Sequence, residues 1–263
     1  MPEESILELH HIYKSFGPVD VLKDVAFSAQ AGEVTALVGD NGAGKSTLVK
    51  CVSGSYSIDS GEYLFEGRPV HVHSPHDSAG LGIEFVYQDL ALCDNLDIVE
   101  NMFLGRERHK RRVLDEISME KAAAETLTSL AVRTVSSVRQ RVSSLSGGQR
   151  QTVAIAKAVL WNSKVVVLDE PTAALGVAQT AQVLDLVRRL ADRGVAVVFI
   201  SHNMVDVMQV ADRIAVLYLG RTAGVVRRDE VNQQQLVELI TTGTLSDGSP
   251  LAESLAQTNG APA

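Results

Sequence analysis

The sequence has few cysteines, few aromatic side chains and no long apolar run. Its two cysteines, Cys51 and Cys93, lie far apart and without metal-ligand spacing. A disulfide framework is therefore not expected, and a reducing cytosol suits the chain. No apolar run approaches the roughly 18 residues of a membrane span, and residues 1–5 lack the basic and apolar regions of a signal peptide. If the protein works at a membrane, we expect another polypeptide to cross it.

Positive charge is also scarce, since Lys and Arg number 24 against 32 Asp and Glu, for a net charge of −8. Proteins that coat nucleic acid usually present a basic face, so we expect no nucleic-acid partner. One basic run stands out at 106–112. We interpret it as a solvated loop, with attraction to anionic lipid headgroups as the alternative. Three histidines at 71, 73 and 76 lack the carboxylate or cysteine that would complete a metal site.

A glycine-rich phosphate loop of the form GxxxxGK[ST] is present at 39–46. An apolar, β-branched run precedes it at 34–38, and a helix-like segment follows at 47–50. Glycines let the backbone approach an anion closely, and N–H groups at a helix N-terminus favour negative charge. We expect Lys45 to reach the outer phosphates of a nucleotide and Ser46 to hold Mg²⁺. The predicted nucleotide-binding residues are Gly39, Asp40, Asn41, Gly42, Ala43, Gly44, Lys45, Ser46 and Thr47.

Two carboxylates, Asp169 and Glu170, follow a second apolar run at 165–168. In open α/β sheets, ligands bind at the carboxyl ends of the strands. Asp169 suits the Mg²⁺ shell, through water, and Glu170 is then placed to polarise an attacking water. This division of roles predicts hydrolysis of a phosphoanhydride. The alternative is an acidic strand end that caps the next helix.

Apolar strands alternate with helical patterns along much of the chain, which predicts an α/β fold with a parallel sheet covered on both faces. Between 89 and 162, alanine, leucine, glutamate and arginine dominate, so we expect a helical insertion there. We expect one domain over 5–243 and a loose tail over 244–263. The expected strands lie at 6–9, 25–28, 34–38, 61–70, 82–87, 165–168, 195–200, 214–219 and 225–226. The expected helices lie at 45–54, 119–131, 178–193 and 232–242.

A third motif, Leu-Ser-Gly-Gly-Gln at 145–149, lies between the other two. Ser146 is a natural helix N-cap, and the glycines leave backbone N–H groups open as a second anion site. With these motifs in this order, the chain resembles the ATP-binding cassette (ABC) transporter ATPases over about residues 5–242. The resemblance implies a P-loop ATPase core with a parallel sheet, an N-terminal antiparallel β subdomain and an inserted α-helical subdomain at about 89–162.

The resemblance also implies roles for residues outside the motifs. Phe16 would stack on adenine, Gln88 would sense Mg²⁺ and the attacking water, and His202 would contact the γ-phosphate. A strand-edge aromatic and a structural histidine are the alternatives. The catalytic set is therefore Glu170, His202 and Gln88, and the Mg²⁺ set is Ser46, Gln88 and Asp169.

In this family the ATP site is shared between two cassettes, so the resemblance implies a head-to-tail homodimer with two equivalent sites. The residues that would close over the ATP of the opposite subunit are Ser146, Gly147, Gly148 and Gln149. One residue departs from the family pattern, because Gly176 stands where an aspartate usually helps to organise the dimer interface. This departure puts the coupling between the two sites in question.

The segments at 87–92, 173–176 and 201–204 resemble those of single-cassette ATPases from bacterial monosaccharide importers of the fructose, ribose or xylose type. The resemblance implies ATP hydrolysis that powers sugar uptake, at the cytoplasmic face of the cell membrane. Transmembrane permease subunits and an extracytoplasmic sugar-binding protein would be its partners. The alternatives are an ABC exporter ATPase for lipid or drug and a nucleotide-gated interaction module with little turnover.

Overall fold

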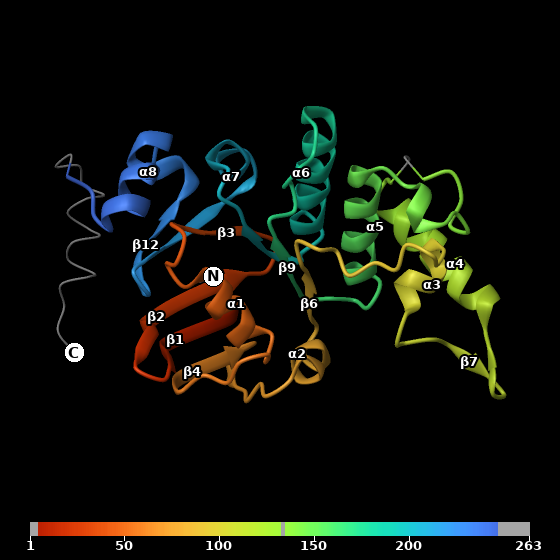
Figure 1. The fold of residues 1–263 in the computed structure, drawn as a ribbon, viewed down its shortest axis with the longest axis horizontal. Coiled ribbons are helices and arrows are strands. Elements are labelled where there is room, and N and C mark those ends of the chain that lie inside the picture. Colours follow the sequence, from red (N-terminus) through yellow and green to blue (C-terminus); the bar gives the residue numbers. More distant parts are fainter. Residues whose placement is uncertain (1–4, 133–134, 247–263) are drawn as a thin grey trace.

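A six-stranded sheet forms the centre of the molecule in the computed structural model, which describes residues 5–132 and 135–246 (Figure 1). The strand order is β12-β11-β3-β10-β9-β6, and all neighbours are parallel except the β11–β12 hairpin. The strands are β3 (Val34–Gly39), β6 (Ile83–Val86), β9 (Val165–Asp169), β10 (Ala196–Ile200), β11 (Arg213–Tyr218) and β12 (Arg221–Arg227). The α/β fold expected from the sequence is confirmed.

Alternate residues of the central strands are buried in two different cores, one on each face of the sheet. In β3, Ala36 and Val38 face one core and Leu37 faces the other. The first core contains residues of α6 (Val177–Ala191), α7 (Met204–Val210) and α8 (Gln233–Thr242). Burial on both faces explains why these strands are continuously apolar.

A second, antiparallel sheet covers the other face, with strand order β2-β1-β4-β5. Its strands are β1 (Ser5–Phe16), β2 (Val19–Gln30), β4 (Ser60–Phe65) and β5 (Arg68–Pro69). Two of these strands, β1 and β2, are much longer than the segments expected at 6–9 and 25–28. Their outward-facing polar residues hide the strand pattern, because only alternate positions are buried.

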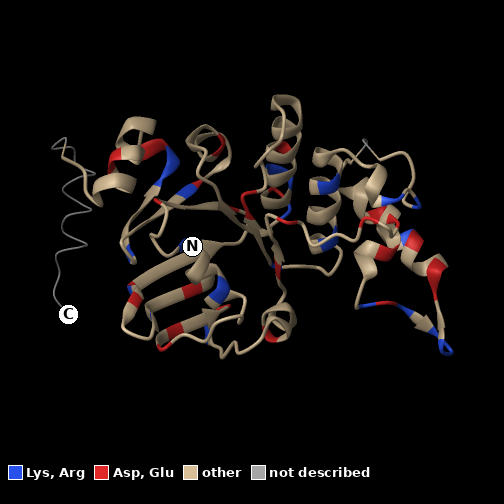
Figure 2. Ribbon diagram, viewed as in Figure 1, with Lys and Arg blue, Asp and Glu red and all other residues tan. Residues whose placement is uncertain are grey.

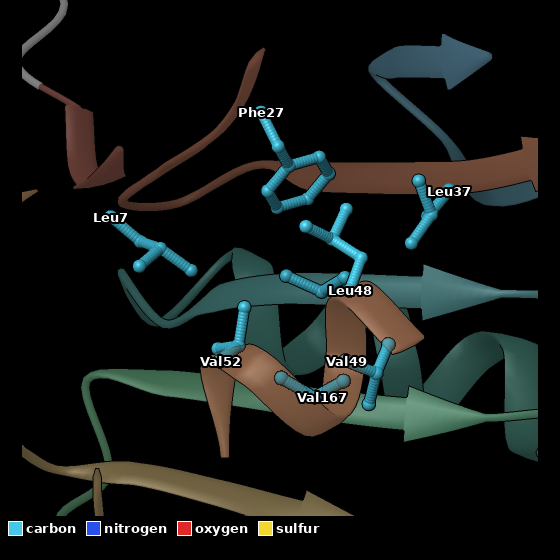
Figure 3. Close-up of a pocket in the computed structure, with 8 residues that line it drawn as sticks. Leu7, Phe27, Leu37, Leu48, Val49, Val52 and Val167 are labelled. Carbon is cyan, nitrogen blue, oxygen red and sulfur yellow. The ribbon is translucent and has the colours of Figure 1, made fainter. Parts of the chain in front are cut away.

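The helix that follows the phosphate loop, α1 (Lys45–Val52), lies between the two sheets. A small apolar cavity of about 10 Å³ borders it (Figure 3). A cavity of this size is near the limit for one water, and its apolar walls offer no hydrogen-bond partner, so it is dry. The helix is thus held to the sheets by apolar contacts at this point. The cavity is lined by Leu7, Phe27, Leu37, Leu48, Val49, Val52, Val167 and Val198.

The insertion between β6 and β9 is mainly helical and lies at one end of the molecule (Figure 1). It contains α3 (Ile98–Phe103), α4 (Glu116–Ser129), a 3₁₀ turn (Val142–Ser144) and α5 (Gly147–Val159). It also contains a short hairpin of β7 (His109–Lys110) and β8 (Val113–Leu114), which the sequence patterns did not predict. Three further elements outside the insertion were not predicted either: α2 (Pro75–Leu81), α7 and a second 3₁₀ turn (Arg228–Glu230).

Within residues 5–132 and 135–246, every helix is too short or too polar to cross a membrane. The expected C-terminal tail, 244–263, falls outside the described residues from position 247 onward.

Candidate active site

The central strands end at one edge of the sheet, and the predicted site residues follow these ends. Strand register places Ile200 beside both Leu37 and Asp169, and it pairs Val86 with Leu168. The phosphate loop therefore begins beside the segment that carries His202, and Glu170 and Gln88 follow the next two strands. Residues from four distant parts of the sequence thus share the edge at which ligands bind in open α/β sheets.

The phosphate loop has a backbone that side chains would obstruct. Gly39 has φ of 155°, and a Cβ there would lie 2.4 Å from the carbonyl oxygen of Leu217. Gly42 has φ of 82° and faces open space. The Nζ of Lys45 donates to the carbonyl oxygens of Gly39 at 2.7 Å and Asp40 at 3.1 Å. The loop is thereby folded around the Lys45 ammonium, which places a positive charge within it.

Charges at this edge are partly removed from water. Burial lowers the pKa of Lys45, and the carboxylates of Glu170, Asp40 and Asp169 oppose that shift. Burial raises the pKa of Asp169, and the nearby charge of Glu170 raises it further, while Lys45 opposes both. A desolvated carboxylate of this kind is stabilised when a cation approaches, because the cation replaces the lost hydration. Together with the exposed Ser46 hydroxyl, Asp169 therefore fits a divalent cation bound to an anionic ligand.

The side chain of Glu170 is held by a single residue of the neighbouring segment. Its Oε2 accepts from His202 Nδ1 at 2.8 Å, and its Oε1 accepts from the backbone N–H of His202 at 3.1 Å. The Glu170 backbone lies in the left-handed region, with φ of 51°, and its N–H donates to the carbonyl oxygen of Ile200 at 3.0 Å. The turn after β9 thus points the carboxylate toward β10, where His202 remains exposed to solvent.

A buried polar contact lies behind this pair. Thr172 Oγ1 donates to Asp206 Oδ2 at 2.6 Å, and Asp206 is only 4% exposed. The Thr172–Asp206 hydrogen bond links the segment after Glu170 to helix α7, which follows His202. Sequence patterns did not identify this contact, because its members lie 34 positions apart and neither has a distinctive local motif.

Phe16 ends β1 and is 42% exposed, so part of its ring is open to solvent. Its ring meets the ring of Tyr56 edge-on, with centroids 5.1 Å apart and an interplanar angle of 70°. The Nζ of Lys14 lies 5.4 Å from the Phe16 centroid. Tyr56 was not predicted as part of the site, since it lies in a turn beyond α1 without a motif of its own. Gln88 is exposed in the loop after β6.

The Leu-Ser-Gly-Gly-Gln motif forms the N-terminus of α5 with a complete capping box. Ser146 Oγ accepts from the Gln149 backbone N–H at 3.3 Å, and Gln149 Oε1 accepts from the Ser146 backbone N–H at 2.8 Å. A Cβ at Gly148 would lie 3.0 Å from the Gln179 side chain, so only glycine fits there without a shift. Figure 1 places α5 beyond α6 and away from α1. The motif therefore does not lie against the phosphate loop of its own chain.

Gly176 caps α6 and is exposed, with ordinary backbone angles (φ −73°, ψ 160°). The backbone here does not demand glycine.

Comparison with known proteins agrees with this geometry. The family model for the ABC transporter matches residues 22–173. The chain is 43% identical to the xylose/arabinose import ATP-binding protein XylG of Sulfolobus acidocaldarius, over 91% of this chain and 95% of that protein. It is 44% identical to the fructose import ATP-binding protein FrcA of Rhizobium meliloti, over 92% of this chain and 95% of that protein. The match to the ribose import ATP-binding protein RbsA 2 of Escherichia coli O157:H7 is 38% identical and spans 48% of its length.

Solved structures agree as well. The ADP conformation of an ATP-binding cassette of an ABC transporter matches with a TM-score of 0.77 at 25% identity, covering 96% of this chain and 98% of that one. A nucleotide-free ATP-binding cassette matches with the same TM-score at 24% identity, over 95% of this chain and 98% of that one. The chain therefore belongs to the ABC transporter family and is an ATPase with the fold of its ATP-binding cassettes.

Proposed function

We propose that this ATPase powers the import of a monosaccharide. The observation that carries the proposal is the identity of 43–44% with proteins named for xylose/arabinose and fructose import, across more than nine-tenths of the chain. A third relative, which is 38% identical, is named for the import of another sugar, ribose. Selectivity for the sugar would lie in other subunits, since the residues assembled here suit a nucleotide. An exporter of lipid or drug has no comparable support.

At the nucleotide, we assign phosphate binding to Lys45 and the loop 39–47, with Phe16 against the adenine. Ser46, Asp169 and Gln88 would hold Mg²⁺, which supplies charge stabilisation at the phosphates when bound. Glu170 would accept the proton of the attacking water, because it directly follows the buried strand β9 and its charge acts on Lys45 of the loop. His202, which holds that carboxylate at 2.8 Å, would keep it aimed and face the γ-phosphate.

We assign the motif at 146–149 to the ATP of a second copy of this chain. Its separation from α1 within the chain supports the assignment, because the exposed Ser146 and Gly147 then face outward for a partner. A two-fold symmetric pair gives both sites the same composition. Binding and hydrolysis would alternate closed and open pairs, which the transmembrane permease subunits convert into transport at the cytoplasmic face of the membrane. An extracytoplasmic sugar-binding protein would deliver the sugar.

Uptake in a deletion strain tests the import function. The strain would be complemented with the wild-type gene, with Lys45→Ala, or with Lys121→Ala, a control lysine exposed on α4. Radiolabelled fructose, ribose, xylose and arabinose would be supplied one at a time. We expect uptake of at least one sugar to require the wild-type or Lys121→Ala gene. Unchanged uptake of all four sugars in the deletion strain would contradict the proposal, and sugar-independent efflux of lipid or drug would favour the exporter.

A further inference from the structure

A basic hairpin projects from the helical insertion, between α3 and α4 (Figure 1). Its strands β7 and β8 pair His109 with Leu114 and Lys110 with Val113. The two residues between the strands are Arg111 and Arg112, both of them exposed. Figure 2 shows this tip as a blue segment at the extremity of the molecule. We call residues 109–114 the basic hairpin.

The turn of the basic hairpin is an unusual place for arginine. Arg111 and Arg112 have φ of 53° and 74°, so both adopt the left-handed conformation. Two-residue hairpins of this type strongly prefer Asn-Gly, because both central residues need a positive φ, which asparagine and glycine adopt most readily. The turn therefore holds two long basic side chains at positions that asparagine and glycine would fill more readily.

The basic residues of the run divide into two groups. Those at the base are engaged within the chain: Arg106 pairs with Glu84 at 2.6 Å, and Arg108 lies 5.2 Å from the centroid of the Phe103 ring. Those at the tip are Lys110, Arg111 and Arg112, and among the described residues no ion pair involves them. Three cations thus stand together at the end of a protein whose net charge is −8.

The acidic side chains next to the tip in the sequence are bound at its base, and no ion pair among the described residues joins them to Lys110, Arg111 or Arg112. Glu107 Oε1 accepts from the Gly105 backbone N–H at 2.9 Å, and Asp115 Oδ1 caps α4 by accepting from the Ser118 N–H at 3.2 Å. These carboxylates keep their negative charge, but within the described part of the chain they form no ion pair with the tip, so its three cations are left for a partner outside the chain.

Aliphatic side chains lie next to these cations and are open to water. Val113 is 69% exposed, Leu114 is 47% exposed, and Ile117 in the first turns of α4 is 83% exposed. A bilayer with anionic lipid offers phosphate groups and, just beneath them, an apolar boundary that aliphatic side chains enter. An acidic protein surface would match the charge but leaves the exposed aliphatic groups without a specific pocket.

We propose that the basic hairpin binds the surface of an anionic phospholipid bilayer. Lys110, Arg111 and Arg112 contact the headgroup phosphates, and Val113 with its exposed neighbours enters the boundary beneath them. The contact gives the cassette a membrane attachment of its own, in addition to its permease partners. It does not depend on ATP, because the basic hairpin is separate from the phosphate loop in Figure 1.

Flotation of the purified full-length chain with vesicles tests this proposal. Vesicles of pure phosphatidylcholine would be compared with vesicles that contain phosphatidylglycerol as well, at low and at physiological salt. The test variant is Lys110→Gln with Arg111→Asn and Arg112→Gly, which removes three charges and installs the preferred turn sequence, so the hairpin is retained. The matched control is Arg68→Gln with Lys121→Gln and Arg221→Gln, which removes three charges from separate exposed sites.

We expect the wild type and the control to float with the anionic vesicles only, and more strongly at low salt. The test variant should bind on the order of a hundredfold more weakly, since each basic residue near such a surface contributes about fivefold. Equal binding by the test variant and the control would overturn the proposal, as would failure of the wild type to float with anionic vesicles. If vesicle binding is absent but the test variant fails to join the permease complex, the partner is an acidic protein surface instead. ATP hydrolysis by the test variant should equal that of the control, which checks folding and separates this result from the assignment of the nucleotide site.

Discussion

His202 contacts Glu170 through two separate atoms. Its Nδ1 lies 2.8 Å from one carboxylate oxygen, and its backbone N–H donates to the other at 3.1 Å. The carboxylate that we assign as general base is thus fixed in direction before any nucleotide arrives. Because a base acts only within hydrogen-bond reach of the proton it removes, this orientation matters as much as the basicity of the group.

Replacing His202 by Ala should slow hydrolysis while leaving nucleotide binding nearly intact. The side-chain donor to Glu170 is lost, whereas the phosphate loop is unchanged, so we expect kcat to fall about 100-fold. Steady-state hydrolysis and equilibrium binding of ATP, each at one pH, check the two effects. His76→Ala, at an exposed position outside the site, is the control. A loss of binding as large as the loss of turnover would argue against an orienting role.

Asp169→Asn should raise Tm at neutral pH and abolish hydrolysis. Burial and the charge of Glu170 raise the pKa of Asp169 above the ordinary value for an aspartate, so its ionised form is disfavoured in the folded state. At neutral pH the carboxylate therefore costs stability, and the amide removes that cost. The cost fades in the wild type as pH falls and the folded-state carboxyl binds its proton, so the gain in Tm should shrink toward acid.

Thermal unfolding of the nucleotide-free protein across a pH series measures this gain. Asp229→Asn, at an exposed position, serves as the control and should change Tm little. A lower Tm for Asp169→Asn at neutral pH, or a gain that grows toward acid, would refute the electrostatic explanation.

Thr172→Val should destabilise the fold by about 1–3 kcal/mol, because the buried Asp206 carboxylate loses a hydrogen-bond donor. The lost bond is the 2.6 Å contact from Thr172 Oγ1. Thr172→Ser keeps the hydroxyl and should retain most of the stability. Urea unfolding of both variants measures the difference, and equal stabilities would show that the hydroxyl contributes nothing.

Tyr56→Ala should weaken ATP binding by about fivefold, since an edge-to-face aromatic pair contributes about 1 kcal/mol to the position of Phe16. Tyr56→Phe keeps the ring and should bind like the wild type. Inorganic triphosphate lacks the adenine, so its affinity should not change in either variant. Calorimetric titration with both ligands tests this, and an equal loss for triphosphate would mean that Tyr56 acts on the phosphate loop instead.

The central strands and the motif positions could be predicted because their patterns are local. Buried β-branched runs identified β3, β9 and β10, and each chemical motif followed such a run or opened a helix. The short helix α7 was missed, since its seven residues span two turns and present little periodicity. The β7–β8 hairpin was missed because its turn consists of two arginines, without the glycine or asparagine that marks such turns.

The contacts within the site depend on tertiary structure and could not be predicted from sequence. The Glu170–His202 pair and the Thr172–Asp206 pair each join segments more than 30 positions apart. Tyr56 meets Phe16 only because β1 and the turn after α1 converge beside the antiparallel sheet. The motifs therefore identified which residues matter, and the fold determined which of them touch.

The most direct test of a shared nucleotide site is the oligomeric state of Glu170→Gln in saturating Mg-ATP, measured by analytical ultracentrifugation. The amide cannot accept the proton, so ATP should remain unhydrolysed between two chains. We predict a stable dimer that holds two ATP molecules, and a monomer for the same variant with Lys45→Ala added. A Glu170→Gln protein that stays monomeric, or that hydrolyses ATP at the wild-type rate, would contradict the assignment.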